Sequence, residues 1–85
     1  MKVTLLYFAS VREAVGGDGE ERELPASLQT PRDVTRWLSG LGENYAAAFA
    51  EPDRLRCAID QVMAPLDAPL GTPREIAFFP PVTGG

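Results

Sequence analysis

The sequence predicts a single α+β domain, in which a mixed sheet of about five strands carries a helical segment across one face. The chain has 85 residues, which is the length of one small domain. Its predicted elements follow the order strand, short turn, strand, helical segment and then three strands. One helical segment packed across a small sheet is the simplest way to cover the apolar faces of these elements.

The chain begins with a predicted strand over residues 3–9, which is rich in β-branched and aromatic side chains. Beyond its threonine this strand is apolar on both faces, so we expect it to be central in the sheet and covered on both sides. Residues 10–15 predict one short helical turn that Ser10 caps. The glycines within residues 16–19 predict a flexible turn, and the charged residues 20–24 predict an exposed strand near an edge.

The helical segment has a clear start. Thr30 suits an N-cap, and Pro31 and Asp33 follow where the first turn favours proline and negative charge. Helical spacing of apolar residues then predicts one buried stripe, and Gly40 and Gly42 are expected to end the helix. The stripe consists of Val34, Trp37, Leu38 and Leu41.

A second helical stretch is predicted over residues 43–51, where Tyr45 and Phe49 lie four apart on one face. The rest of the chain predicts three strands separated by a tight turn and a proline-rich loop. The predicted strands are residues 55–59, 62–64 and 74–79, with the turn at 60–61 and the loop at 65–73.

Composition excludes several classes of function. The net charge is −4, which argues against binding to nucleic-acid phosphates. The chain has no histidine and a single cysteine, so an internal disulfide and a multi-cysteine zinc site are impossible. That cysteine, Cys57, lies in a predicted strand, and we expect a buried, inert thiol. No stretch approaches the ~20 apolar residues that span a bilayer, so we expect a cytoplasmic protein without membrane contact. Because histidine is absent and there is one cysteine, we expect no metal site, and we expect no bound cofactor.

The C-terminus is the most informative segment. Pro80 and Pro81 lack N–H donors and have a fixed φ, so the chain is expected to leave the last strand in an extended, stiffened form. Gly84 and Gly85 carry no Cβ and permit close backbone approach. Together they present a bare α-carboxylate on a thin arm that suits a narrow channel of another protein. The alternative is a frayed end without a function.

A family resemblance favours a functional C-terminus over a frayed end. The final eight residues, Phe-Phe-Pro-Pro-Val-Thr-Gly-Gly, resemble the C-terminus of the MoaD-type sulfur carriers, the small subunits of molybdopterin synthase. Residues 5–16 resemble the family's first strand and turn, and residues 58–61 resemble a later turn, with Asp60 where the family commonly has Asn. The resemblance implies a β-grasp, ubiquitin-like fold over residues 1–85, with residues 80–85 as an extended tail.

The resemblance also implies a mechanism. An E1-like, ATP-dependent adenylyltransferase would activate the carboxylate of Gly85 as an acyl-adenylate, and a sulfur donor would convert it to a thiocarboxylate. The tail, with Gly84 beside the reacting group, would then enter the large, catalytic subunit of molybdopterin synthase. There the sulfur would pass to cyclic pyranopterin monophosphate. The chain would thus be a sulfur-carrying subunit without catalytic side chains, and ATP would be bound by its partner.

Several residues are candidates for partner binding. The resemblance favours Phe79 as part of a hydrophobic docking surface, with Phe8 and Met63 beside it, and places Arg12 at the same partner surface. Because Phe78 and Phe79 alternate across the last strand, one of the two is expected to face the core. For Phe8 and Met63 taken singly core packing is favoured over docking, and for Arg12 a solvated charge has the same weight as a partner contact. The tail candidates are Pro80, Pro81, Val82 and Thr83.

Other functions remain open at this point. A sulfur carrier for another pathway, such as thiazole synthesis, would share the terminal Gly-Gly. A ubiquitin-like protein modifier would use Gly85 to form isopeptide bonds to lysine side chains. An inert interaction module would have a frayed C-terminus that takes part in neither sulfur transfer nor isopeptide formation.

Overall fold

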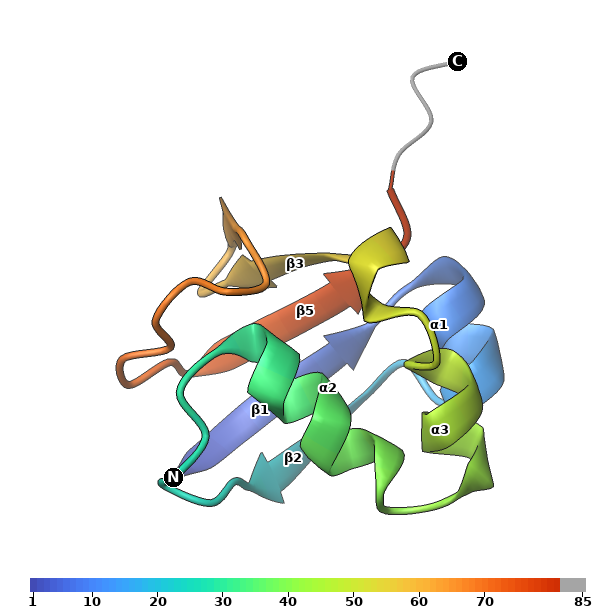
Figure 1. The fold of residues 1–85 in the computed structure, drawn as a ribbon, viewed down its shortest axis with the longest axis horizontal. Coiled ribbons are helices and arrows are strands. Elements are labelled where there is room, and N and C mark those ends of the chain that lie inside the picture. Colours follow the sequence, from blue (N-terminus) through green and yellow to red (C-terminus); the bar gives the residue numbers. More distant parts are fainter. Residues whose placement is uncertain (82–85) are drawn as a thin grey trace.

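Five short strands form one mixed sheet in the order β2-β1-β5-β3-β4 (Figure 1). The computed structural model describes residues 1–81. Its strands, together with three α-helices and a short 3-10 helix, confirm the predicted α+β class and the number of strands. The elements are β1 (Lys2–Tyr7), α1 (Ala9–Val15), β2 (Gly19–Glu23), α2 (Pro31–Ser39), α3 (Glu43–Ala48), η1 (Pro52–Arg54), β3 (Arg56–Ile59), β4 (Val62–Ala64) and β5 (Glu75–Phe79).

The last strand lies in the middle of the sheet. β5 runs parallel to β1 on one side and antiparallel to β3 on the other, whereas β2 and β4 form the two edges. Because β1 and β5 are parallel, their carboxyl ends reach the same end of the sheet, where Figure 1 shows Pro80 and Pro81 leaving it. The topology therefore anchors the C-terminal segment in the most constrained part of the fold.

The first strand is shorter than predicted. It ends at Tyr7 because the backbone turns at Ala9, which has a positive φ of 53°. The helix α1 begins there, one residue earlier than expected, with Phe8 at the N-cap position and no side-chain cap hydrogen bond. The predicted capping role of Ser10 is therefore wrong, since Ser10 lies inside the helix.

The second helix begins as predicted. The Thr30 hydroxyl accepts a hydrogen bond from the backbone N–H of Asp33 at 3.1 Å, and Pro31 occupies the first turn. Val34 and Leu38 are fully buried, but the expected burial of Leu41 is wrong, because its side chain is 40% exposed. The helix ends at Ser39, so Leu41 no longer keeps the helical register that would turn it toward the core.

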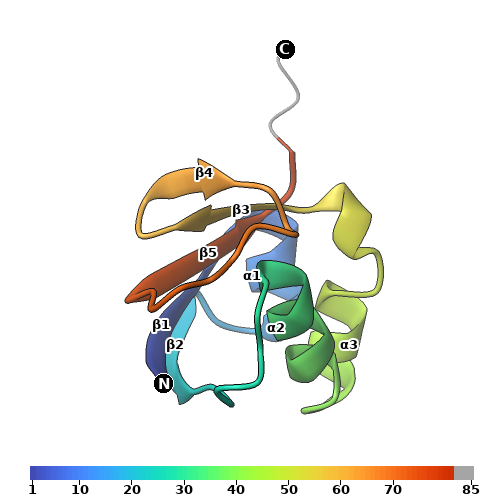
Figure 2. The ribbon, with the colours of Figure 1, turned by 60° about the vertical axis from the view of Figure 1, so that its left-hand side comes forward.

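The hydrophobic core lies between the inner face of the sheet and the helices, which Figure 2 shows gathered on one side of it. Tyr7, Phe49 and Phe78 form an aromatic cluster with edge-on geometry. The ring centroid of Phe49 lies 6.3 Å from that of Tyr7 and 5.3 Å from that of Phe78. Each such buried aromatic side chain contributes about 1.5–3 kcal/mol to folding. The fully buried inner-face residues of the strands are Val3, Leu5, Tyr7, Cys57, Ile76 and Phe78.

Candidate docking face and carrier terminus

The face of the sheet away from the helices, here called the outer face, is apolar over four strands. The pairing places Leu6 opposite Ala77, Ala77 opposite Ala58, and Ala58 opposite Met63. The prediction that β1 is central is confirmed, but the prediction that both its faces are covered is wrong, since the helices lie on the inner face only (Figure 2). The residues Leu6, Phe8, Ala58, Met63, Ala77 and Phe79 are called the outer apolar patch below.

Two aromatic rings stand at one end of this patch. Phe8 and Phe79 meet edge-on, with their ring centroids 6.5 Å apart. Phe8 is 47% exposed, Phe79 is half-buried and Phe78 is fully buried, which confirms the predicted alternation along β5. Met63 is 62% exposed, so core packing is the wrong interpretation for both Phe8 and Met63.

Sequence reasoning missed one member of this surface and one exposed residue of the opposite face. Leu6 is half-exposed on the outer face. Val62 pairs with Ile59 of the inner-face series and is 68% exposed on the edge strand β4. The alternation along β1 is a signal that could have placed Leu6 there, because inward Leu5 and Tyr7 require Leu6 to point outward. Nothing in the sequence around Val62 marks it as exposed.

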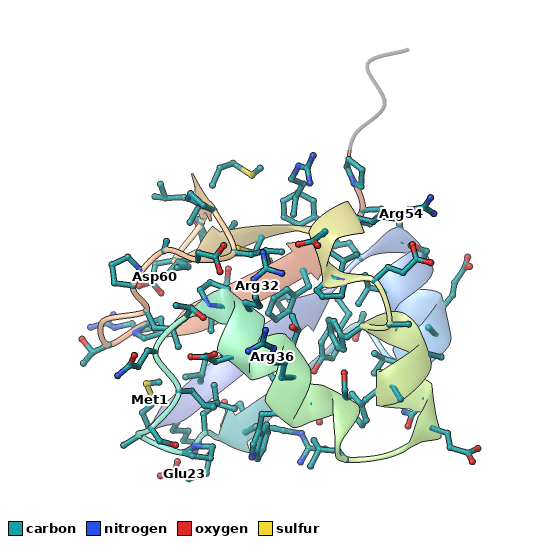
Figure 3. All side chains as sticks on the ribbon, in the orientation of Figure 1. Met1, Glu23, Arg32, Arg36, Arg54 and Asp60 are labelled. Carbon is teal, nitrogen blue, oxygen red and sulfur yellow. The ribbon has the colours of Figure 1, made fainter. Side chains whose placement is uncertain are left out.

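Pro80 and Pro81, the first residues of the tail, line an open hollow at the end of the sheet. This hollow has a volume of about 590 Å³, and Figure 3 shows Arg54, one of its lining residues, beside the point where the chain leaves the sheet. Pro80 is half-buried and Pro81 exposed. The candidates Val82, Thr83, Gly84 and Gly85 lie outside the described residues. The hollow is lined by Ser10, Asp53, Arg54, Arg56, Pro80 and Pro81.

Arg12 lies on α1, close to the aromatic end of the patch. Its side chain is exposed and lines, together with Leu6 and Phe8, a second open hollow of about 420 Å³. Within residues 1–81 no carboxylate lies within 4.0 Å of its guanidinium. The guanidinium is therefore placed where a partner that covers Phe8 would also meet it.

Cys57 belongs to the opposite, inner face. Its side chain is fully buried and its Sγ donates to the backbone oxygen of Ala64 at 3.1 Å. Burial raises the pKa of this thiol, so the reactive thiolate is disfavoured. The predicted buried thiol is confirmed. Among residues 1–81, no cluster of three or more acidic or cysteine side chains is placed to hold a metal ion, and no helix is both long and apolar enough to cross a membrane.

Comparison with known proteins places this arrangement in a family. The sequence model of the ThiS family matches residues 5–85. The chain belongs to the ThiS family. Within the family it is similar to proteins called molybdopterin synthase sulfur carrier subunit. The one from Escherichia coli K12 is 37% identical over 83 residues, which cover 98% of this chain and 99% of the relative. The one from Mycobacterium tuberculosis is 38% identical over 85 residues, covering 100% and 99%.

Solved structures confirm the β-grasp, ubiquitin-like fold that is expected of a ThiS-family chain. A putative molybdopterin converting factor, subunit 1, from Pyrococcus furiosus is 27% identical, with a TM-score of 0.73 over 96% of this chain and 99% of that chain. SAMP1 from Haloferax volcanii is 21% identical, with a TM-score of 0.71 over the whole of both chains. At that identity the second likeness establishes the fold alone.

Proposed function

We propose that this ThiS-family chain is the sulfur carrier subunit of a molybdopterin synthase. The observation that carries the proposal is the end-to-end similarity to relatives of that name, at 37–39% identity over 98% or more of this chain. A relative that matched only the fold or only the terminal Gly-Gly would leave the pathway open. Here the match extends over the strands that build the outer apolar patch as well as over the C-terminus.

The chemistry takes place on the C-terminal carboxylate. One oxygen of the Gly85 carboxylate attacks the α-phosphorus of ATP in an E1-like adenylyltransferase, and pyrophosphate leaves. A sulfur donor at the oxidation level of sulfide then displaces AMP, which gives the thiocarboxylate. In the large subunit the thiocarboxylate sulfur bonds to a carbon of cyclic pyranopterin monophosphate and displaces an oxygen substituent from that carbon. Water then hydrolyses the acyl–sulfur bond, which leaves the sulfur on the pterin and returns the carboxylate. An unhindered glycine terminus with Gly84 before it suits all three steps.

The structure supports this proposal because it fixes the position at which the tail begins. β5 is central and hydrogen-bonded on both sides, so Pro80 and Pro81 begin the tail from a fixed position. The outer apolar patch beside them offers a docking surface to a protein that encloses the tail. Its exposed methionine is flexible and polarizable, which suits repeated use by two partners, the activating enzyme and the large subunit. The catalytic side chains and the ATP site belong to these partners.

A protein-modifier function is the alternative from a different class. Small archaeal modifier protein 1 from Haloferax volcanii shares the fold at 20% identity and a TM-score of 0.70. At this identity only the fold is comparable, so the full-length similarity to the carrier subunits favours the sulfur-carrier function. A modifier would form higher-mass adducts with lysine side chains that depend on Gly85.

The experiment compares the full chain with a variant that lacks Gly84 and Gly85. Both are incubated with the activating enzyme, ATP, a sulfide donor, the large subunit and cyclic pyranopterin monophosphate. The truncated chain is expected to fold and to bind the large subunit through the outer apolar patch, but to form neither thiocarboxylate nor molybdopterin. Molybdopterin formation by the truncated chain would overturn the proposed function.

A further inference from the structure

Arg56 stands on the outer face directly beside the aromatic end of the outer apolar patch. In the antiparallel pair β3–β5 it lies opposite Phe79, and its side chain is exposed. It also lines the hollow from which Pro80 and Pro81 lead into the tail. A protein that covered Phe79 and received the tail would therefore also cover Arg56.

Among the residues that the structure describes, no carboxylate balances the charge of Arg56. Within residues 1–81 no carboxylate lies within 4.0 Å of its guanidinium, which makes one hydrogen bond, from Nη1 to the backbone oxygen of Leu55 at 3.0 Å. The neighbouring Arg54, in contrast, is paired with Glu51 at 2.9 Å. On a chain of net charge −4, Arg56 thus places a positive charge directly beside Phe79 of the outer apolar patch.

We propose that Arg56 receives a carboxylate of the large subunit when the two subunits dock, and so helps to select that partner. This inference rests on the proposed function, because it assumes that the large subunit encloses the tail. Covering an unpaired guanidinium is costly, whereas covering it against a carboxylate gives a bidentate, charge-assisted hydrogen bond. The outer apolar patch supplies the buried area, and Arg56 adds a requirement for negative charge at one place on the partner.

The test measures the affinity of the full chain for the large subunit with four variants. R56K keeps the positive charge, R56M keeps the length of the apolar stem, and R56E reverses the charge. R74E is the matched control, because Arg74 is also exposed, has no carboxylate within 4.0 Å among the described residues, and precedes β5 at the opposite end of the sheet. R56E and R74E change the net charge equally.

We expect R56M to weaken association by about tenfold, the size of one lost hydrogen bond to a charged group, and R56E to weaken it further. R74E is expected to stay within about threefold of the wild type, as is usual for a remote surface site. R56K is expected to bind between the wild type and R56M, because lysine keeps the charge but not the bidentate geometry. The affinity of the wild type is expected to fall with added salt more steeply than that of R56M, because salt screens the ion pair.

The outcomes separate the two proposals. If the wild-type chain forms no complex with the large subunit, the proposed function is overturned and this inference with it. If the wild type binds, and R56M and R56E bind as tightly as R74E, the inference alone is overturned. An R56M variant that binds more tightly than the wild type would also overturn it, since the side chain would then act through its apolar stem. Thermal melting of each variant checks that the fold is intact.

Discussion

At the scale of single residues, Glu20 is the centre of a polar cluster on the inner face of the sheet. Its Oε2 accepts hydrogen bonds from the hydroxyls of Tyr7 at 2.9 Å and Tyr45 at 2.6 Å. Its Oε1 lies 2.9 Å from Nε of Arg22, a close ionic contact without the alignment of a hydrogen bond. Arg22 donates instead through Nη2 to the Tyr45 hydroxyl at 3.1 Å. One carboxylate thus joins β1, β2 and α3.

The first prediction concerns this carboxylate. Replacing Glu20 by Gln removes the charge that both tyrosine hydroxyls and Arg22 face, and it is expected to lower the free energy of unfolding by about 1–3 kcal/mol. Urea unfolding followed by fluorescence measures the change. E21Q is the matched control on the same strand, because the Glu21 side chain is 63% exposed and its ion pair with Lys2 contributes at most about 1 kcal/mol. Equal effects of the two substitutions would contradict the assigned role of Glu20.

A second prediction concerns alkaline pH. Burial, and then the hydrogen bond to Glu20, raise the pKa of the Tyr7 hydroxyl above its ordinary value. The folded state therefore keeps this proton at a pH where the unfolded state loses it, so stability is full below about pH 10 and falls as the pH rises further. Urea unfolding at successive pH values is expected to show a smaller loss in Y7F than in the wild type. Identical pH profiles would contradict this prediction.

At the scale of elements, the turn between β3 and β4 also fixes the start of β5. Asp60 has a positive φ of 49°, and its Oδ1 accepts hydrogen bonds from the backbone N–H groups of Arg74 at 2.8 Å and Glu75 at 3.0 Å. Aspartate and asparagine tolerate this left-handed backbone better than other side chains, and both offer an oxygen in the same place. An asparagine at this position would therefore meet the same two requirements as Asp60.

The third prediction follows from this geometry. D60N keeps both the oxygen and the tolerated backbone, and it is expected to change the free energy of unfolding by no more than about 0.5 kcal/mol. D60A loses both hydrogen bonds and is expected to destabilise the chain by about 1–3 kcal/mol. Thermal or urea unfolding of the two variants compares them. An alanine variant as stable as D60N would show that the turn does not depend on this side chain.

The fourth prediction belongs to the edge strand β4. M63E places a charge within the outer apolar patch and is expected to weaken binding to the large subunit by about tenfold or more, as at a buried contact of an interface. Because Met63 is 62% exposed, the isolated chain is expected to remain folded. V62E is the control, since Val62 is 68% exposed on the same strand but pairs with Ile59 of the inner-face series. Equal losses of affinity would contradict the assignment of the outer apolar patch.

The elements that the sequence predicts well are those with local signals. The start of α2 depends on Thr30, Pro31 and Asp33, which lie within four residues, and the structure has it where expected. Ser10 carries a similar local signal but does not act as a cap, because the turn at Ala9 moves the helix start forward. The prediction that Leu41 is buried is wrong for the same kind of reason, since it depends on where the preceding helix ends.

At the scale of the whole molecule, the difference between the two faces of the sheet is what the sequence could not supply. Because successive residues of β1 and β5 are apolar, the sequence shows that these strands have two apolar faces. It does not show that helices cover only one of the two faces. The pairs Arg56–Phe79 and Ala58–Met63 depend on strand order and register, which join distant parts of the chain. The terminal Gly-Gly could be recognised without the structure, whereas Arg56 could not.

Sulfur carried on the C-terminus is the core of the proposed function, and mass spectrometry detects that sulfur as a change in mass. The full chain is incubated with the E1-like enzyme, ATP and a sulfide donor, and its intact mass and fragments are measured. We expect a gain in mass equal to one oxygen replaced by one sulfur, located on Gly85 and absent without ATP. A carboxylate that stays unmodified while the same enzyme activates a known carrier, or sulfur located on Cys57, would contradict it.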